Sequence, residues 1–347
     1  MRTRSGASRA AKTTYSGVSS DYQHLQRALS LAARVSPRAV SPNPRVGCVI
    51  VKNGKIVGED SHRRFGGPHA EAAALKQAGA RAKGATAYVS LEPCSPFPGK
   101  KTPACAEALV AAGVKRVVFP SLDPNPKVAK RGLASLKRAR IKVDVVRELA
   151  AEAEAINRGF FSRMRRGRPW VILKTALSLD GKAAAASGRS RWVTGKPARD
   201  AVHEMRAELD AVLVGAGTVL ADDPALTAHG AGPDPLRVVL AGRRPLPANA
   251  RVFDDAAPTV VYRAKKRGDL RGVLKDLAAD GVGTLLLEGG PTIHAAFLRA
   301  GLVDEARVFL APKLLSGADD PNTAPRLKEP KLKKIGDDWL IEGRLHV

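Results

Sequence analysis

The sequence predicts an α/β protein built from two successive domains, and three observations support this fold class. The chain has 347 residues, enough for two domains of roughly 150 residues each. Hydrophobic residues make up 44% of it, so each domain can bury a core. Short runs of Val, Ile and Leu alternate with segments of helical periodicity, which favours sheets with a largely parallel core. We expect domains over residues 21–165 and 166–347, after a basic, disordered tail over residues 1–20.

The charge balance points to an anionic partner. Lys and Arg number 58 against 33 Asp and Glu, a net charge of +25, which attracts phosphorylated metabolites or nucleic acid. Aromatic residues make up only 4%, so rings on which single-stranded nucleic acid could stack are scarce. We therefore expect a phosphorylated small-molecule substrate and no nucleic-acid partner, with most of the excess charge on a solvated surface.

The cysteine content and the hydropathy of the sequence indicate in which cellular compartment the protein is expected. Three Cys are too few for a disulfide framework, and no apolar run approaches the about 20 residues of a membrane helix. We therefore expect a cytoplasmic protein that binds no membrane. Residues 1–20 carry four basic and no acidic side chains, which also fits a plastid transit peptide. A plain disordered tail is the favoured interpretation, because chain termini are usually loose.

The first half opens with a helix and a turn-rich segment. Apolar residues share one helical face over residues 21–35. Asn43 lies between two prolines that hold the backbone extended, and its amide either reads the edge of a base or belongs to an ordinary loop. Asn53-Gly54 then predicts a tight hairpin.

One His and two Cys in the first half have the character of a zinc site. His69, Cys94 and Cys105 can supply three ligands, and a catalytic zinc site leaves the fourth position to water. Glu71 lies at the start of a predicted helix, where it can shuttle protons without binding the metal. Helices beginning near His69 and Cys105 would point their N-termini at the ion and favour thiolates. The His-x-Glu…Pro-Cys…Cys arrangement is typical of zinc deaminases that act on nucleobases.

Each of these residues also has an ordinary structural interpretation. The helix dipole alone favours a Glu in the first turn, and a lone Cys is more often a small buried apolar residue. Cys48, inside a Val- and Ile-rich run, is expected to be such a buried strand residue. Only the combination of four fitting positions within residues 69–105 indicates metal chemistry.

Strands and helices continue to alternate along the chain. A basic connector with five Arg is expected over Arg158–Arg168. The further strands are expected at 85–91, 116–119, 141–146, 170–175, 211–215, 236–240, 259–262, 284–287 and 307–310. The further helices are expected at 129–139, 148–158, 197–209, 269–279 and from about 291 through Phe297.

Two segments of the second half follow buried strands and are candidates for binding. After Leu285–Leu287, Gly289-Gly290 lets the backbone approach a phosphate at a helix N-terminus, although a tight turn into a helix would look the same. Thr218–Thr227 is interpreted as a polar loop whose carboxylates either bind ribose hydroxyls or merely solvate the loop.

Motifs in both halves, in the same order, resemble one family. The chain is similar to the bifunctional enzymes of riboflavin biosynthesis, which fuse a pyrimidine deaminase to a reductase that resembles dihydrofolate reductase. The resemblance implies a cytidine-deaminase-like three-layer domain followed by a dihydrofolate-reductase-like α/β domain. The motifs that carry it are 43–47, 68–71, 91–94, 102–105, 123–126, Lys174, 178–182, Trp192, 218–227, 288–292 and 311–315.

The resemblance implies one zinc ion, NADPH and two consecutive reactions. Hydroxide on zinc attacks the amine-bearing carbon of 2,5-diamino-6-(5-phosphoribosylamino)pyrimidin-4(3H)-one, and Glu71 moves the protons as ammonia leaves. NADPH then delivers hydride to the ribosyl group and opens it to a ribityl chain, giving 5-amino-6-(5-phosphoribitylamino)uracil. A homo-oligomer, dimer or tetramer, is also implied.

The positions that match the family's motifs also imply which residues contact NADPH and which contact the substrate. The NADPH contacts are expected from Ala176, Trp192, Thr218, Asp222, Gly290, Pro291, Thr292, Ile293, His294, Ala295 and Ala296. The substrate contacts are expected from Asn43, Lys101, Ser190, Arg206, Leu226, His229 and Glu288. Arg206 suits this role physically, because a cation on a helix can hold a phosphate.

The chain departs from the family pattern at four positions. Pro96 stands where a substrate-contacting His is usual, and Lys130 replaces a glycine. His229 stands where an Arg is common near the substrate phosphate, and Gly242 replaces a polar residue near the cofactor. Two alternatives therefore stay open: a nucleic-acid-acting deaminase with a C-terminal binding module, and a chain in which only the reductase is active.

Overall fold

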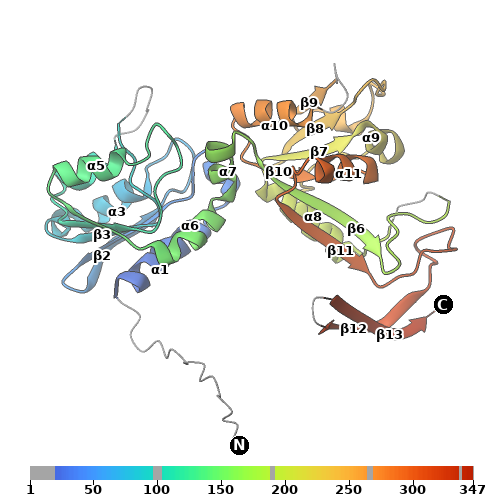
Figure 1. The fold of residues 1–347 in the computed structure, drawn as a ribbon, viewed down its shortest axis with the longest axis horizontal. Coiled ribbons are helices and arrows are strands. Elements are labelled where there is room, and N and C mark those ends of the chain that lie inside the picture. The colour runs from blue at the N-terminus through green and yellow to red at the C-terminus, as the bar shows by residue number, and fades with distance from the viewer. Residues whose placement is uncertain (1–19, 97–103, 188–191, 264–268, 336–337, 347) are drawn as a thin grey trace, which may run out of the picture.

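The computed structural model describes residues 20–96, 104–187, 192–263, 269–335 and 338–346. In this part of the chain each half has its own sheet covered by helices, and a two-stranded hairpin lies near the C-terminus (Figure 1). The predicted α/β fold class is confirmed. The predicted tail lies outside the described residues except for Ser20, which begins the first helix. Within the described residues, every helix is too short or too polar to cross a membrane.

The first half contains a five-stranded sheet in the order β2-β1-β3-β4-β5. β1 is antiparallel to both of its neighbours, whereas β3, β4 and β5 are parallel, so only part of this sheet matches the largely parallel arrangement that was predicted. The strands are β1 (Gly47–Lys52), β2 (Lys55–Ser61), β3 (Thr86–Val89), β4 (Arg116–Phe119) and β5 (Lys142–Val145). The helices are α1 (Ser20–Ala33), α2 (Pro37–Val40), α3 (Ala70–Ala78), α4 (Cys105–Ala111), α5 (Arg131–Arg138), α6 (Ala150–Ile156) and α7 (Arg158–Arg166), with 3-10 turns at Gly79–Ala82 and Arg147–Leu149.

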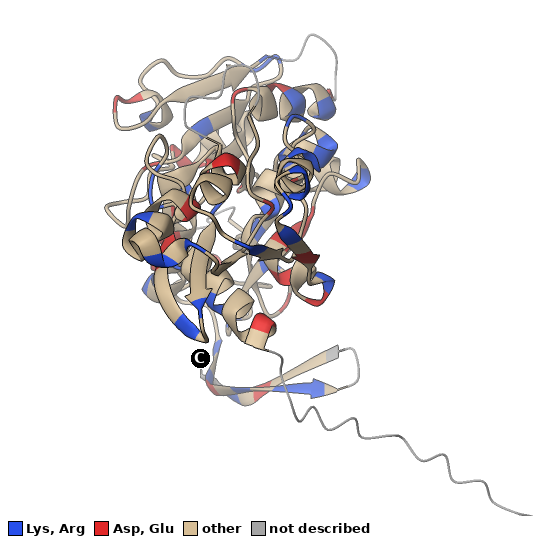
Figure 2. Cartoon of the chain, turned by 90° about the vertical axis from the view of Figure 1, so that its left-hand side faces the viewer, with Lys and Arg blue, Asp and Glu red and all other residues tan. Residues whose placement is uncertain are grey.

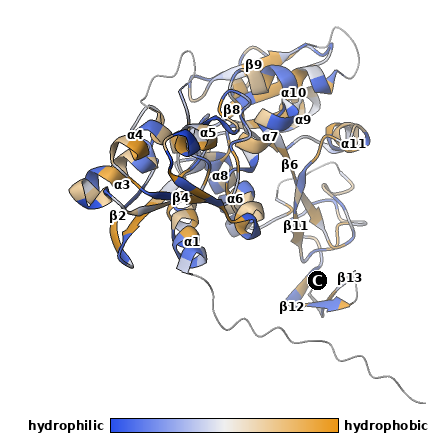
Figure 3. Cartoon of the chain, turned by 60° about the vertical axis from the view of Figure 1, so that its left-hand side comes forward, coloured by the Kyte–Doolittle hydropathy of each residue, from blue (hydrophilic) through white to orange (hydrophobic). Residues whose placement is uncertain are grey.

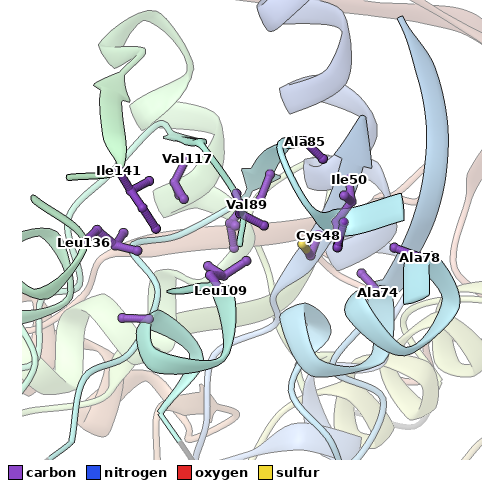
Figure 4. Close-up of a cluster of buried hydrophobic side chains, with 14 of the residues drawn as sticks. Cys48, Ile50, Ala74, Ala78, Ala85, Val89, Leu109, Val117, Leu136 and Ile141 are labelled. Atoms are coloured by element: carbon purple, nitrogen blue, oxygen red, sulfur yellow. The ribbon is translucent and has the colours of Figure 1, made fainter. Parts of the chain in front are cut away.

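Helices cover both faces of this sheet, which gives the three layers that were expected. On one face α3, α4 and α5 pack over the sheet, and Cys48 lies fully buried among them as predicted (Figure 4). On the other face α1 and α6 pack Leu29 and Ala153 against Val49 and Tyr88. The inner strand β1, between β2 and β3, is apolar on both faces because both faces are covered.

The second half contains a six-stranded sheet in the order β11-β6-β10-β7-β8-β9, and all of its strand pairs are parallel. Helices α10 and α11 cover one face, and α8 and α9 cover the other. Because parallel strands end at the same edge of a sheet, the loops after β7 and β10 lie together there. The strands are β6 (Trp170–Ser178), β7 (Ala211–Gly215), β8 (Leu236–Leu240), β9 (Thr259–Tyr262), β10 (Thr284–Leu287) and β11 (Glu305–Ala311). The helices are α8 (Lys196–Glu208), α9 (Ala216–Asp222), α10 (Leu270–Ala279) and α11 (Pro291–Arg299), with a 3-10 turn at Arg251–Phe253.

The predicted basic connector is helical: it forms α7, whose Arg158, Arg165 and Arg166 each pair with a carboxylate and so do not repel one another. Basic residues are in fact spread over both halves with acidic residues among them (Figure 2). The polar loop at 218–227 begins as helix α9, and only the part from Asp223 onward is a loop.

The C-terminal hairpin was not predicted. Strands β12 (Arg326–Ile335) and β13 (Asp338–His346) pair antiparallel with each other. Hydrophobic residues lie on both strands, and the hairpin projects away from the rest of the chain (Figure 3). Among them, Leu332 and Trp339 are 63% and 59% exposed. A strand is usually predicted from the alternation of apolar residues that face a core, and among the described residues this hairpin faces no core.

Arg237 on β8 holds together the loops at the edge of the second sheet. Its side chain is fully buried and donates hydrogen bonds to the Asp254 carboxylate and to the hydroxyl oxygen of Thr259. It also donates to backbone carbonyl groups of Ala225, Arg251, Asp254 and Ala257.

We predict that Arg237→Met lowers the free energy of unfolding of the second half by about 3 kcal/mol, because several carbonyls then lose their only charged donor. The three Trp of the chain, Trp170, Trp192 and Trp339, all lie in the second half, so Trp fluorescence during urea unfolding measures this loss. The control Arg271→Met removes one exposed hydrogen bond, to the Ala300 carbonyl, and should cost no more than about 1 kcal/mol. Equal losses in both variants would contradict the role given to Arg237.

Candidate functional site

Three side chains from separate turns of the first half converge on one point. His69 immediately precedes α3, Cys94 lies in the loop after β3, and Cys105 is the first residue of α4. The His69 Nδ1 atom is 3.6 Å from the Cys94 Sγ atom and 3.3 Å from the Cys105 Sγ atom. All three ligand atoms lie within 4.8 Å of one another.

This geometry fits one tetrahedral zinc ion. Zn–S and Zn–N bonds of about 2.3 and 2.0 Å place sulfur and nitrogen ligands about 3.5 Å apart, which matches both measured N–S distances. Two sulfurs and one imidazole are also the donor set of a catalytic zinc site with a free fourth position. His69, Cys94 and Cys105 could therefore hold a zinc ion, as the sequence motif predicted.

The pKa values of the two thiols are shifted in opposite directions, as expected for two sulfurs that share one proton. The pKa of Cys94 is lowered, first by a hydrogen bond from the Cys105 thiol and also by His69. The pKa of Cys105 is raised, first by that same hydrogen bond and then by burial. The backbone N–H of Cys105, at the start of α4, also points to the Cys94 sulfur at 3.5 Å. A divalent cation removes this competition, because it stabilises both thiolates at once.

Glu71 lies beside this cluster in a buried position. Its side chain belongs to the first turn of α3 and is 3% exposed. Burial raises the pKa of its carboxyl group, and the neighbouring Cys94 thiolate raises it further. A carboxyl group whose pKa is moved toward neutrality can both accept and donate a proton.

Glu92 fixes the loop that carries Cys94. Its carboxylate accepts backbone N–H groups from Asp123, Lys130 and Leu133 at 3.0–3.1 Å, so the loop is tied to the start of α5. Lys130 reaches this position with a left-handed backbone (φ 61°). That conformation favours glycine, which explains why glycine is usual here in the resembled family.

Two polar groups near the cluster were missed by the sequence reasoning. His62 is 3% exposed, and its ring lies 5.1 Å from that of His69, centroid to centroid. Its Nδ1 atom faces the Pro68 carbonyl at 3.0 Å, while its Nε2 atom is buried and has no hydrogen-bond partner among the described residues. The hydroxyl of Ser95, next to Cys94, is also buried, and no described residue forms a hydrogen bond with it. His62 lies on an ordinary-looking strand end, so only the three-dimensional contact with His69 identifies it.

The other predicted site residues of the first half, Asn43 and Lys101, do not belong to the metal cluster as the structure describes it. Asn43 lines a cavity of about 510 Å³ between the two halves of the chain, together with Arg45, Arg158 and Arg163. Pro42, beside it, accepts a hydrogen bond from Arg163 at 2.8 Å, and Arg38 links the halves by donating to the Asp234 carbonyl at 3.1 Å. Lys101 lies outside the described residues.

A second cluster lies at the C-terminal edge of the second sheet. Glu288 follows β10 directly, and its two carboxylate oxygens accept hydrogen bonds from the Nε and Nη2 atoms of Arg206 on α8, at 2.7 and 3.0 Å. Arg206 also donates to the Thr227 carbonyl at 3.0 Å, and the Lys174 ammonium is 3.7 Å from Glu288. Burial acts to raise the pKa of Glu288, but Arg206 and then Lys174 outweigh it, so the pKa is lowered and the group stays ionised.

The expected cofactor loop is adjacent to this cluster. Gly290 is the N-cap of α11, and a side chain there would come within 3.8 Å of the Thr218 hydroxyl on α9. Ile293 packs so closely under Gly215 and Gly289 that a Cβ atom at either glycine would come within 2.8 Å of it. The glycines thus keep the backbones after β7 and β10 close together and free of side chains.

The remaining candidates of the second half are positioned as follows. Ala176 lies on β6 and pairs with Phe309 of β11. Trp192 is half-exposed, with the Arg199 guanidinium 4.4 Å from its ring centroid. Asp222 lies at the end of α9, and Leu226 and His229 lie in the loop that follows it. Helix α11 carries Pro291, Thr292, His294, Ala295 and Ala296. Ser190 lies outside the described residues.

Comparisons with known proteins match both halves. The model of the cytidine and deoxycytidylate deaminase zinc-binding region matches residues 19–121, and the RibD C-terminal domain matches residues 169–341. The riboflavin biosynthesis protein RibD of Escherichia coli (strain K12) is 41% identical and covers 92% of this chain and 98% of its own length. The RibD protein of Aquifex aeolicus is 38% identical, with 92% and 97% covered.

Solved structures agree in fold over nearly the whole chain. Acinetobacter baumannii RibD superposes with a TM-score of 0.79 at 37% identity, covering 94% of this chain and 98% of that one. A diaminohydroxyphosphoribosylaminopyrimidine deaminase/5-amino-6-(5-phosphoribosylamino)uracil reductase from Thermotoga maritima has a TM-score of 0.76 at 34% identity, with 92% and 96% covered.

We predict that Cys105→Ser loses most of the bound zinc, because second-sphere changes alone weaken metal sites about 10–100-fold and this change removes a ligand. Elemental analysis of the purified protein measures the loss. Cys48→Ala is the matched control, since Cys48 is buried in β1 and lies outside the cluster. Full zinc occupancy in Cys105→Ser, or an equal loss in Cys48→Ala, would show that the ligand set is wrong.

Proposed function

Because the chain belongs to the RibD family of riboflavin biosynthesis, we propose specific roles for its residues in the two reactions of that family. The chain is a bifunctional deaminase and reductase. We assign deamination of 2,5-diamino-6-(5-phosphoribosylamino)pyrimidin-4(3H)-one to the first half and reduction of the ribosyl group to the second. The convergence of His69, Cys94 and Cys105 beside a buried Glu71 is the observation that carries this assignment.

Glu71 is the proposed proton carrier of the first reaction. A zinc ion on His69, Cys94 and Cys105 supplies Lewis acidity, which makes water a nucleophile at neutral pH. The carboxylate of Glu71 accepts a proton from the attacking water, and its acid form donates a proton to the departing amine nitrogen. The raised pKa of the buried carboxyl group supports both steps.

His62 is proposed to hold the pyrimidine. Because its Nδ1 atom faces the Pro68 carbonyl, Nδ1 carries the hydrogen and Nε2 is a bare acceptor. Burial lowers the pKa of His62, which keeps the ring neutral. An N–H group of the pyrimidine would satisfy Nε2. Asn43 and Lys101 remain proposed substrate contacts, on the strength of the resemblance.

The second site is proposed to be organised by the Arg206–Glu288 pair. Arginine has five N–H donors, and three of them are already used by Glu288 and Thr227. Arg206 therefore mainly orients Glu288 and keeps two donors for the substrate. Leu226, His229 and Ser190 are the other proposed substrate contacts.

NADPH, when bound, supplies the hydride. Its phosphates are proposed to lie against the N-terminus of α11, in the segment from Gly290 to Ala296, because the first turn of a helix has backbone N–H groups without intrahelical partners. Thr218, close to Gly290, and Ala176, Trp192 and Asp222 complete the proposed contacts. The usual polar residue near the cofactor is Gly242 in this chain, and its backbone is left-handed (φ 59°).

We further propose a homodimer formed through the C-terminal hairpin. An isolated two-stranded hairpin is marginally stable in water, yet β12 and β13 expose Leu332, Trp339 and Leu340. β11 is an edge strand of the second sheet and exposes Val308 and Leu310, each about half. In a symmetric dimer each hairpin can cover the β11 edge of the other copy. A cytoplasmic location is proposed as well, on the basis of the three free thiols.

Glu71→Gln tests the deaminase assignment. We expect deamination to slow by about 10²–10⁴-fold, because the amide cannot carry the proton, while zinc content stays unchanged. Ammonia release from the diaminopyrimidine measures the first reaction. NADPH oxidation with the deaminated substrate is the internal control and should be unaffected. Retained ammonia release in Glu71→Gln would remove Glu71 from the mechanism.

The double variant Leu332→Lys/Leu340→Lys tests the dimer. Two added charges on the hairpin should shift the chain to monomer in sedimentation velocity, since burying an unpaired ammonium is costly. The control is Leu220→Lys on α9, where the leucine is 49% exposed, similar to the 45% of Leu340. A wild-type chain that sediments as a monomer, or a double variant that remains dimeric, contradicts the hairpin interface.

A further inference from the structure

One arginine of the first half donates the hydrogen bonds of its side chain only to the second half. Arg38 lies on α2, which packs against α8. Its Nη2 atom donates to the Asp234 carbonyl at 3.1 Å, and its Nη1 atom lies 3.4 Å from the Asp210 carbonyl and 3.5 Å from the Asp210 carboxylate. Its Nε atom is buried and has no partner among the described residues. Within the described chain, the Arg38 side chain therefore serves the junction between the halves.

The two acceptors of Arg38 differ in how firmly the second half itself holds them. Asp210 directly precedes β7, and its carboxylate accepts the N–H groups of Gly283 and Thr284 and the Thr284 hydroxyl, at 2.9–3.0 Å. Asp210 is thus fixed to the start of β10 without help from the first half. Asp234 lies shortly before β8, and among the described residues Arg38 is the hydrogen-bond donor to its carbonyl. The position of Asp234 therefore depends more on Arg38 than that of Asp210 does.

The carboxylate of Asp234 holds the loop that follows α9. The Ala228 N–H donates to this carboxylate at 2.6 Å. The adjoining Thr227 carbonyl accepts from Arg206 at 3.0 Å, and Arg206 is the partner of Glu288. A short series of hydrogen bonds therefore runs from the first half to the ion pair of the second site.

This loop needs such contacts to keep its conformation. Leu226 and His229 have left-handed backbones, with φ angles of 56° and 49°, which are unfavourable for residues other than glycine and persist only where the surroundings impose them. Gly230 follows with φ 84°, and glycine has the largest conformational freedom of all residues. Because Leu226 and His229 are proposed substrate contacts, the hydrogen bonds beside them determine whether the loop is ready to bind.

We propose that Arg38 is a positioning residue for the reductase reaction: from the first half, it holds Asp234 and thereby the substrate-binding loop of the second half. The inference rests on the proposed function, since Leu226 and His229 contact substrate only if the second half reduces the phosphoribosyl compound. Arg38 acts through Asp234 and not on the reacting atoms, so it affects substrate affinity and not hydride transfer. The first half is then a structural part of the second active site, which gives the fusion of the two enzymes a physical role.

The test compares reduction of the deaminated substrate by the full-length wild type, Arg38→Met and Arg38→Lys, with saturating NADPH. Without Arg38 the loop must be ordered when substrate binds. KM should therefore rise about tenfold in Arg38→Met, the lower end of what one hydrogen bond from a charged donor contributes, while kcat changes little. Arg38→Lys keeps the charge and a donor for the Asp234 carbonyl, so it should recover part of the affinity.

Two controls separate this role from general damage to the fold. Arg34→Met removes the same charge from an exposed side chain near α2 that donates no hydrogen bond to the described residues, and it should leave KM unchanged. Ammonia release by the first half should be equal in the wild type and in every variant. A KM that stays unchanged in Arg38→Met, or that rises equally in Arg34→Met, overturns the inference.

A double-mutant cycle tests the path through the loop. Asp234→Ala leaves the backbone carbonyl that Arg38 binds and removes the carboxylate that holds the Ala228 N–H. Each single variant should raise KM, and the double variant Arg38→Met/Asp234→Ala should raise it no further than the larger single effect, because both changes interrupt the same series of contacts. Effects on KM that simply multiply would show that Arg38 does not act through Asp234 and would overturn the inference.

Failure of the proposed function can be told apart from failure of the inference. If the wild type reduces no substrate, the proposed function of the second half fails, and amide hydrogen exchange over residues 226–234 of the full-length protein then tests Arg38 directly. Exchange should be faster in Arg38→Met than in the wild type and in Arg34→Met. Equal exchange in all three proteins overturns the inference.

Discussion

The structure of the first half depends on two sulfurs, one imidazole and one carboxyl group being held together in a buried space. Cys94 and Cys105 compete for a proton, and Glu71 beside them is pushed toward its neutral form. A divalent cation resolves this competition, because it replaces the shared proton and leaves the carboxyl group free to exchange its own. The three layers of the domain serve to bring the ends of β3, α3 and α4 to this point, and Glu92 fixes the loop between them.

The second half uses the same physical principle with different groups. Glu288 stays ionised although it is buried, because Arg206 donates two hydrogen bonds to it and Lys174 lies nearby. The parallel sheet brings the end of β10, where Glu288 lies, next to the loop after β7. Most of the charge in this cluster is therefore compensated within the protein itself.

Much of this organisation was readable from the sequence, for identifiable reasons. Apolar runs of strand length, separated by segments of helical periodicity, predicted the positions of nearly every strand. The metal ligands were found because few proteins have these residue types in this order. The errors came from segments whose structure depends on distant partners. The ion pairs of helix α7 were not predicted because its carboxylate partners, such as Asp304, lie far away in the sequence. His62 was missed for the same reason, and the hairpin β12–β13 has no core among the described residues that would have identified its apolar residues. The domain boundary near residue 165 remains a prediction.

X-ray absorption at the zinc edge of the purified, unchelated protein tests the central claim most directly. The account predicts one metal shell with two sulfurs at about 2.3 Å and nitrogen or oxygen donors at about 2.0 Å. A shell without sulfur, or one built from four sulfurs, would contradict the convergence of His69, Cys94 and Cys105 on a single catalytic ion.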